Sequence, residues 1–301
     1  MPVARSVREW PSARLTLARK QTPRDDELLA AVAAPHSASP VSHDSILLTH
    51  AEPVQRAYLL FHGLTASPRQ FEPFGRMLYE RGANVYIPRL PRHGLADRLT
   101  TELEALTADE LRAFALASVG FARTLAPRLN VVGFSVGGLL AAWVAQHVPV
   151  DRVTAIAPFL GVAWLPGRML RRAAYVARTL PNRFIWWDPI LRERQQPAHG
   201  YPRFSTHAVA EAIALAQELM ADAERHAPAA RDVQLLFNAS ESTVDNVETK
   251  RLAALWSAWK GNRIVLHRLR GLPLSHDIIE PLRSPAVARS VAAALLDLVE
   301  R

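Results

Sequence analysis

Short apolar runs alternate with longer amphipathic segments through most of this chain. Runs of this kind are typical of strands inside a parallel sheet, where both faces are covered. The predicted strands lie at 46–49, 57–61, 83–88, 131–132, 153–157, 235–237 and 263–267. The predicted helices lie at about 70–81, 107–122, 136–147, 247–260 and 285–298. This alternation predicts an α/β fold with a doubly wound, mostly parallel sheet and right-handed crossovers.

The alternation stops between 160 and 230, where the sequence is helical and rich in aromatic residues and shows no clear strand. We therefore expect an α/β core made of 45–159 and 231–301, interrupted by a helical cap at 160–230. Residues 1–44 are predicted to form an N-terminal extension that packs on the core, with a short helix at 25–34.

Composition excludes several classes of protein. The chain has 49% hydrophobic residues, which suits a soluble globular protein, and no cysteine, which excludes disulfides, thiolate metal sites and cysteine nucleophiles. The formal net charge is +8, but the arginines are spread along the chain among acidic residues and no nucleic-acid-binding motif is present. We expect no nucleic-acid partner. No apolar run reaches the length of a signal-peptide core or a membrane span, so a cytoplasmic location is predicted.

One motif dominates the candidate chemistry. The strand at 131–132 runs into Gly133-Phe134-Ser135-Val136-Gly137, and an Ala/Leu-rich helix follows. Strand, sharp turn and helix in this order form the context of a nucleophile elbow, in which glycines allow a strained serine to point at the helix N-terminus. Because the pattern also arises by chance, it predicts a nucleophile only if partner residues follow in the right order.

Serine needs a base, usually a histidine that is held by an acid, and on such a sheet the chain order is serine, acid, histidine. The histidines after Ser135 are at 147, 199, 207, 226, 267 and 276. His276 is the best placed, because it lies in a loop just after the last predicted strand, where strand ends meet the binding crevice. His267 alternates within a strand and His147 ends a helix, so both are expected to be structural.

Two carboxylates compete for the role of the acid in the loop after 235–237. Glu241 follows the strand by four residues, whereas Asp245 is placed like an N-cap for the next helix. We favour Glu241 and keep Asp245 as the alternative. The oxyanion hole is expected to use the backbone N–H groups of Val136 and Leu64, with Gly63 permitting the turn that aims the second donor. His62 is expected to be structural.

The segments that carry these residues resemble the α/β-hydrolase superfamily, and more narrowly its bacterial carboxylesterase and monoacylglycerol-lipase-like branch. They are Phe61-His62-Gly63-Leu64-Thr65, Pro91-Arg92-His93-Gly94, Gly133 to Gly138, Glu241-Ser242-Thr243-Val244 and Leu274-Ser275-His276-Asp277. The resemblance implies that Ser135 is the nucleophile, His276 the base, and Leu64 and Val136 the oxyanion donors. Relatives usually carry Asp at the position of Glu241, which leaves the identity of the acid open.

The predicted function is hydrolysis of carboxylic esters, with short or medium acyl chains or monoglycerides, through an acyl-enzyme on Ser135 and without metal or cofactor. Most apolar residues of the cap are expected to fill its own core, and a few to line an acyl pocket. They are Trp164, Leu165, Met169, Leu170, Phe184, Ile185, Trp186 and Trp187. The interleaved arginines raise a second hypothesis, weak contact with acidic membrane surfaces. An acyltransferase or perhydrolase on the same triad, and a non-catalytic binding protein of the same fold, remain alternatives, and the sequence does not indicate the oligomeric state.

Overall fold

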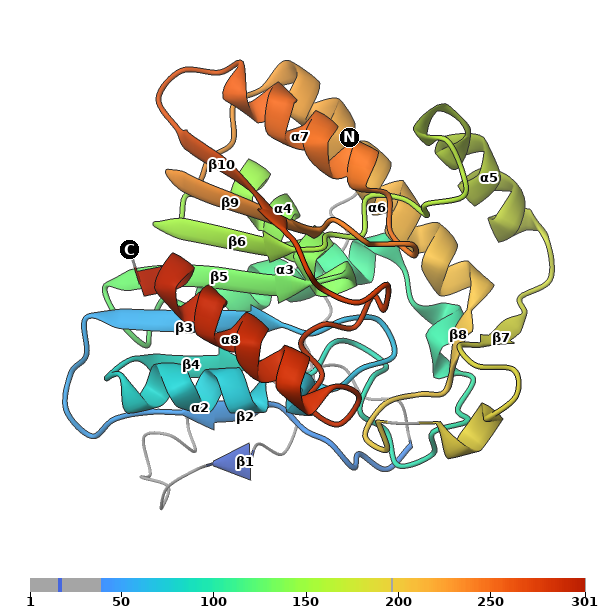
Figure 1. Cartoon of the computed structure of the whole chain (residues 1–301), viewed down its shortest axis with the longest axis horizontal. Helices are drawn as coiled ribbons and strands as arrows, with labels where there is room; N and C mark the ends of the chain where they lie inside the picture. Colours follow the sequence, from blue (N-terminus) through green and yellow to red (C-terminus); the bar gives the residue numbers. More distant parts are fainter. Residues whose placement is uncertain (1–15, 18–38, 196, 301) are drawn as a thin grey trace, which may run out of the picture.

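An eight-stranded sheet runs through the centre of the computed structural model, which describes residues 16–17, 39–195 and 197–300 (Figure 1). The strand order is β1-β2-β4-β3-β5-β6-β9-β10, and every neighbouring pair is parallel except β2 and β4. These strands are β1 (Thr16–Leu17), β2 (Ile46–Leu48), β3 (Arg56–Phe61), β4 (Asn84–Ile87), β5 (Arg128–Phe134), β6 (Arg152–Ile156), β9 (Asp232–Asn238) and β10 (Arg263–Leu269). The sequence-based prediction of a doubly wound, mostly parallel sheet is confirmed.

Helices cover both faces of the sheet. They are α2 (Glu72–Glu80), α3 (Ala108–Ala122), α4 (Val136–His147), α6 (Thr206–Arg225), α7 (Asn246–Ser257) and α8 (Pro285–Glu300). In Figure 1, α2 and α8 lie in front of the sheet, where Arg81 and Glu300 form an ion pair of 3.4 Å between them. Helices α3 and α4 lie behind it, and α4, α6 and α7 contact one another in succession. None of the helices in the described part of the chain combines the length and apolar composition needed to cross a membrane.

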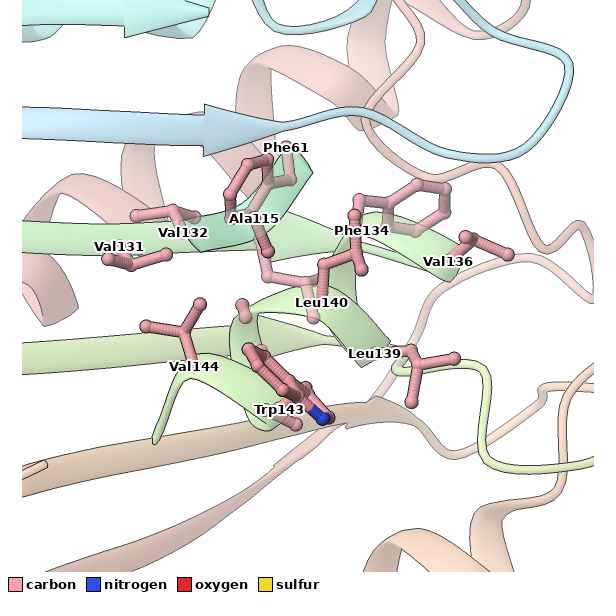
Figure 2. Packing of buried hydrophobic residues seen from close by; sticks show 14 of the residues in the cluster. Phe61, Ala115, Val131, Val132, Phe134, Val136, Leu139, Leu140, Trp143 and Val144 are labelled. Carbon is pink, nitrogen blue, oxygen red and sulfur yellow. The ribbon is translucent and has the colours of Figure 1, made fainter. Parts of the chain in front are cut away.

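The helix after the serine motif is the most deeply buried helix of the core. Every residue from Val136 to Gln146 is buried, which explains why this segment consists mostly of Ala, Leu, Val and Gly. Leu139, Leu140 and Val144 of α4 belong to the buried core, and Figure 2 shows Leu140 and Val144 on the side of α4 that faces the labelled side chains of β5. Since apolar burial is the main favourable term in folding, α4 and β5 hold the turn between them on a rigid support.

The start of α3 follows the predicted capping pattern in part. The Thr107 hydroxyl accepts the N–H of Glu110 at 3.1 Å, as an N-cap does. The Glu110 carboxylate does not return to the cap, however, and accepts the Arg92 guanidinium at 3.0 Å. Helix α3 is thereby linked to the loop that follows β4.

The insertion between β6 and β9 contains two short strands that the sequence did not predict. It comprises α5 (Gly167–Thr179), β7 (Phe184–Trp186), the 3-10 turn η3 (Arg192–Arg194) and β8 (Arg203–Ser205), and continues into α6. Strands β7 and β8 pair antiparallel over three residues each, and the Arg203 guanidinium lies 4.5 Å above the Phe184 ring. Three-residue strands are too short to produce a periodic pattern, which is why the expectation of no strand was wrong.

The cap boundary at 160–230 remains a prediction, because α6 contacts both α5 and the core helix α4. In Figure 1, β7 and β8 lie beyond the carboxyl ends of the central strands. The helix expected at 25–34 falls outside the described residues. Of the extension, residues 39–44 contact the core, where the N–H of His43 donates to the Gly94 carbonyl at 2.9 Å.

Candidate functional site

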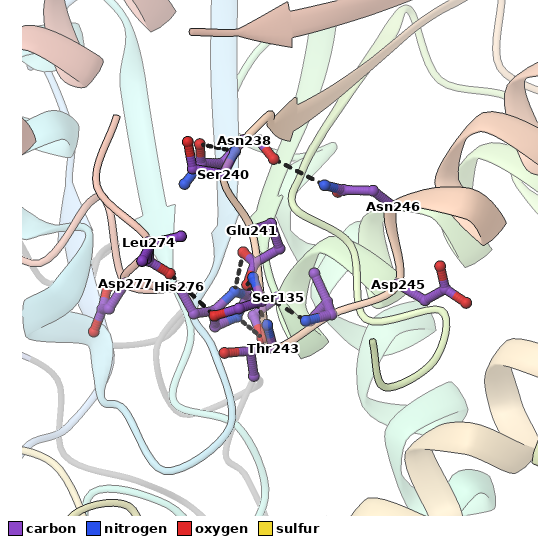
Figure 3. Close-up of polar contacts among 12 residues, drawn as sticks. Ser135, Asn238, Ser240, Glu241, Thr243, Asp245, Asn246, Leu274, His276 and Asp277 are labelled. Atoms are coloured by element: carbon purple, nitrogen blue, oxygen red, sulfur yellow. Dashed lines mark hydrogen bonds and ion pairs between the residues drawn. The ribbon is translucent and has the colours of Figure 1, made fainter. Parts of the chain in front are cut away.

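The structure brings Ser135, His276 and Glu241 into one hydrogen-bonded chain at the carboxyl edge of the sheet (Figure 3). Ser135 Oγ lies 2.8 Å from His276 Nε2, and His276 Nδ1 lies 2.7 Å from Glu241 Oε2. The three residues come from the turn after β5, the loop after β10 and the loop after β9. If Nδ1–H donates to the carboxylate, Nε2 keeps a lone pair that faces the serine hydroxyl. The arrangement can thus remove a proton from Ser135.

The turn at Ser135 is strained, and glycines make it fit. Ser135 has φ 57° and ψ −118°, a backbone conformation that side-chain-bearing residues rarely adopt. A Cβ on Gly137 would lie 2.0 Å from the Phe61 carbonyl oxygen, and one on Gly133 would lie 2.0 Å from the Gly137 oxygen. Strand, turn and helix can therefore approach only where these positions lack side chains.

Glu241, and not Asp245, faces His276. The Glu241 side chain is fully buried, and its Oε1 accepts the backbone N–H groups of Ser242 at 2.9 Å and Thr243 at 2.7 Å. Burial acts to raise the pKa of Glu241, but hydrogen bonding and the charge of His276, together with the loop amides, outweigh it and lower the pKa. The carboxylate is thus held ionised with one oxygen aimed at the imidazole.

Asp245 has a different partner. Its Oδ1 accepts the N–H of Val247 at 2.7 Å, so it is the N-cap of α7. Figure 3 shows its carboxylate pointing away from His276.

The loop after β3 leaves one of its amides without an acceptor among the described residues. Of the amides from Gly63 to Ala66, three have protein acceptors: Gly63 donates to Gln70 Oε1, Thr65 to His93 Nε2, and Ala66 to the Gly63 oxygen. The remaining amide belongs to Leu64, which lines the same cavity as Ser135 and Val136. Gly63 does not have the positive φ that its expected role implied; Thr65 does, with φ 66°. The chain therefore turns two residues later than expected.

Two buried histidines hold this loop against the one that follows β4. His62 Nε2 accepts the N–H of Leu90 at 3.1 Å, and His93 Nε2 accepts the N–H of Thr65 at 3.1 Å. Burial lowers the pKa of His93 to about 4 and that of His62 well below its usual value, and the nearby Arg89 guanidinium acts in the same direction on both rings. Both imidazoles are therefore neutral and can accept these bonds. His62 is structural, as expected from its place in the chain.

Residues 58–296 match the model of the alpha/beta hydrolase family. The chain belongs to the alpha/beta hydrolase family. Among its relatives, a thermostable monoacylglycerol lipase from Bacillus sp. (strain H-257) is 30% identical over 91 residues, which are 30% of this chain and 35% of the relative. The match thus spans about a third of the length of that lipase.

Solved structures show the same fold over most of this alpha/beta hydrolase. A soluble variant of monoglyceride lipase from Saccharomyces cerevisiae, in complex with a substrate analog, has a TM-score of 0.65 at 12% identity and covers 88% of this chain and 97% of its own. The monoacylglycerol lipase of Paleococcus ferrophilus has a TM-score of 0.62 at 19% identity and covers 84% of this chain and 98% of its own. At these identities the likeness concerns the fold.

A cavity of about 320 Å³ opens at Ser135 in this alpha/beta hydrolase. Most of its wall is apolar, and its polar and charged residues include Gln70, Arg98, Gln195, Asp277 and Arg283. The apolar lining includes Leu64, Phe134, Val136, Phe159, Trp187, Val209, Val244 and Leu274. This volume and lining suit a small, largely uncharged ligand with one reactive polar group near Ser135.

The apolar residues of the cap are less buried than the sequence led us to expect. Trp164 is 78% exposed and Met169 48%, whereas Leu170 is fully buried. Trp187 is the residue of that predicted set that lines the cavity, and its indole N–H donates to the Thr65 hydroxyl at 2.8 Å. The expectation that most of these side chains fill the cap's own core was wrong, because all of them except Leu170 are half-buried or exposed.

Three other histidines that follow Ser135, at 147, 199 and 267, have other partners. His147 Nε2 lies 3.5 Å from Asp222, and His267 Nε2 lies 3.1 Å from Gln234 Oε1. His199 lies between Ser67 and Glu280, at 3.0 and 3.3 Å, and so attaches the cap loop to the core. The structural roles expected for His147 and His267 agree with these contacts.

Sequence reasoning missed several residues that organise the site. Gln70 contacts the loop at Gly63 and also Asp277, and the Tyr201 hydroxyl donates to the Arg92 carbonyl at 2.9 Å. In the sequence, Gln70 is a polar residue at the predicted start of a helix that covers the sheet. Exposed polar residues occupy such positions as well, so the pattern does not single it out. Its burial could not be read from the sequence.

Proposed function

We propose that this protein hydrolyses carboxylic esters through an acyl-enzyme on Ser135. The observation that carries the proposal is the chain of two short contacts, 2.8 Å from Ser135 Oγ to His276 Nε2 and 2.7 Å from His276 Nδ1 to Glu241. Serine, base and buried acid at these distances are the arrangement that serine hydrolases use for acyl transfer.

In the proposed reaction, Ser135 Oγ attacks the ester carbonyl while His276 Nε2 takes the hydroxyl proton. Glu241 stabilises the imidazolium that forms, and the backbone N–H groups of Leu64 and Val136 bind the oxygen that becomes negative. His276 then gives its proton to the leaving alcohol. A water molecule that donates its proton to His276 attacks the acyl-enzyme and releases the acid. The scheme requires neither a metal nor a cofactor.

The proposed substrates are esters or monoglycerides with short or medium acyl chains. The cavity of about 320 Å³ with its mostly apolar wall supports this class, as does the partial match to a monoacylglycerol lipase. A weak contact of the cap with acidic membrane surfaces stays a hypothesis. Of the cap arginines, Arg178 is already paired with Glu211 at 2.7 Å.

A chain-length series of chromogenic 4-nitrophenyl esters tests this function. We expect wild type to turn over the shorter esters and Ser135→Ala to lose turnover by at least ~10³-fold while keeping its thermal midpoint. With added alcohol, we expect the free acid to remain the main product and little of the acyl group to be transferred to the alcohol. If the new ester were the main product, the protein would be an acyltransferase. Absence of turnover and of labelling by a fluorophosphonate probe would indicate a binding protein and contradict the proposal.

A further inference from the structure

One glutamine side chain bridges the two loops that would carry the oxyanion donor and the base. Gln70 ends the 3-10 turn η1 (Pro68–Gln70) and is only 3% exposed. Its Oε1 accepts the N–H of Gly63 at 2.9 Å, next to Leu64. Its Nε2 donates to Asp277 Oδ1 at 3.1 Å, next to His276. A single amide group therefore links Gly63, beside Leu64, to Asp277, beside His276.

We propose that Gln70 is a positioning residue that fixes the Leu64 amide relative to the His276 imidazole during ester hydrolysis. This inference rests on the function proposed above. Gln70 would not touch the reacting atoms, because both of its polar atoms are engaged by Gly63 and Asp277. It would act by keeping two loops in register while charge develops on the substrate oxygen.

The chemistry of the two partners explains why an amide fits this position. The N–H of Gly63 can only donate, so it needs an acceptor, whereas an ionised Asp277 can only accept, so it needs a donor. Glutamine supplies both at the ends of one planar group, and the two partners together determine which way the amide faces. A carboxylate could serve Gly63 but would repel Asp277, and an apolar side chain would leave both groups without a partner.

Gln70 joins these loops directly beside Leu64 and His276, whereas His199 joins them farther along, between Ser67 and Glu280. His62 and His93 attach the loop at 63–65 to the segment at 90–93. On the other side, Asn238 Nδ2 donates to the Pro273 carbonyl at 2.7 Å and fixes the start of the His276 loop to the end of β9. Each loop also has its own anchor, and Gln70 is the bridge that lies next to both Leu64 and His276.

Loss of this link should affect the transition state more than the bound ester. A neutral carbonyl tolerates a loosely aligned donor, but the oxygen of the tetrahedral intermediate needs donors at short distances. For Gln70→Met, which has a similar length and no hydrogen-bonding group, we expect kcat to fall about 10- to 100-fold and KM to stay within about twofold. The affinity for a boronic acid, which forms a tetrahedral adduct on serine, should fall by a similar factor.

Gln146→Met is the matched control. Gln146 is also a buried glutamine with bonds at both ends of its amide, since it accepts from Trp256 Nε1 at 2.6 Å and donates to the His226 carbonyl at 3.2 Å. It lies in α4, outside the cavity lining. We expect Gln146→Met to lower the thermal midpoint at least as much as Gln70→Met while leaving kcat and boronic-acid affinity within about twofold.

A second variant, Gln70→Glu, keeps the acceptor for Gly63 and places a second carboxyl group beside Asp277. The charged groups around Asp277 are Glu280, His276 and Arg283. When one proton is shared between the two carboxyl groups the bridge can persist, and when both ionise they repel. The activity of Gln70→Glu relative to wild type should therefore fall as the pH rises, and this comparison decides the matter if Gln70→Met does not fold.

Steady-state kinetics of these variants on one 4-nitrophenyl ester, with boronic-acid inhibition, is the test. The inference is supported if Gln70→Met loses kcat and boronic-acid affinity together and Gln146→Met does not, and if the relative activity of Gln70→Glu falls with pH. It is overturned if wild type is active and Gln70→Met retains kcat, or if the Gln70→Glu ratio is independent of pH. An inactive wild type would instead contradict the proposed function.

Discussion

The carboxylate behind His276 is the residue that the sequence left open. Glu241 and Asp245 are four residues apart in one loop, and each has a plausible role by spacing alone. Side-chain direction separates them, because Glu241 turns back toward the imidazole while Asp245 binds the first turn of α7. The direction of each side chain depends on how the loop after β9 folds, and this conformation could not be predicted from the order of the residues.

Substitution of the two acids should give opposite results. Glu241→Gln removes the charge that stabilises the imidazolium, and we expect kcat to fall by about 10²- to 10⁴-fold. Asp245→Asn keeps an oxygen that can cap α7, so kcat should stay within about threefold and the thermal midpoint should change little. Kinetics on a 4-nitrophenyl ester measure both; a crippled Asp245→Asn beside an active Glu241→Gln would reverse the assignment.

Asp277 should make stability depend on pH. Burial, reinforced by the charge of Glu280, raises its pKa from 3.8 to about 6, so the folded state disfavours the ionised form. The cost is fully present above about pH 6 and disappears as the pH falls below the unfolded value. Asp277→Asn, which retains an acceptor for Gln70, should thus raise the thermal midpoint at about pH 8 and lose that advantage by about pH 4. A difference that does not vary with pH would refute this account of Asp277.

At the scale of elements, the strand–turn–helix unit around Ser135 was predicted almost completely. Its glycine pattern, its apolar strand and its Ala/Leu-rich helix are features of the local sequence that agree with the global fold, so they could be recognised without knowledge of tertiary contacts. Outside the insertion, the other long strands and helices were also predicted to within a few residues, because each has a continuous apolar pattern. Helices α5 and α6 of the insertion were predicted only as a helical region without bounds. β7 and β8 were missed because each has only three residues, too few for a periodic pattern, and β8 begins with the charged residue Arg203.

Gly137→Ala tests whether close approach explains the glycines of this unit. The new Cβ would lie 2.0 Å from the Phe61 carbonyl oxygen, a backbone atom that cannot move aside without shifting β3. We expect a loss of about 3 kcal/mol in the free energy of unfolding, measured by chemical denaturation. Gly120→Ala is the control: this exposed glycine of α3 has open space around it, and the change should stabilise by about 0.5 to 1 kcal/mol. Equal effects at the two positions would exclude this explanation.

At the scale of the whole molecule, the insertion between β6 and β9 lines one side of the cavity, and one of its loops is bound to the core by several hydrogen bonds. The described residues of its loop, 193–195 and 197–201, are fixed to the core by His199, by the Tyr201 amide, which donates to the Thr65 carbonyl at 2.7 Å, and by Arg98. The Arg98 guanidinium alone donates to the carbonyls of Gly200 at 2.8 Å and Gln195 at 3.1 Å, among others. Contacts over such sequence distances arise only in the folded chain, so the sequence predicted the insertion but not how it is held.

Removing the Arg98 contacts should loosen that loop selectively. In Arg98→Met the carbonyls of Glu193, Gln195, Pro197 and Gly200 lose the Arg98 donor, and we expect faster hydrogen exchange of the amides around them than in wild type. Arg112→Met is the control, since Arg112 pairs at the surface with Asp109 and Glu218 and should contribute little. Exchange at 193–200 that equals wild type would show that Arg98 does not hold the loop.

The central claim, covalent catalysis by Ser135, is tested most directly by locating the adduct left by 4-nitrophenyl diethyl phosphate. Its phosphoryl group should transfer to the nucleophile and remain there, because the tetrahedral ester that results is hydrolysed slowly. The account predicts release of one equivalent of 4-nitrophenol, loss of ester turnover and a diethylphosphoryl group on the peptide that contains Ser135. Ester turnover that survives the reagent, or an inactivating adduct on any other residue, would contradict it.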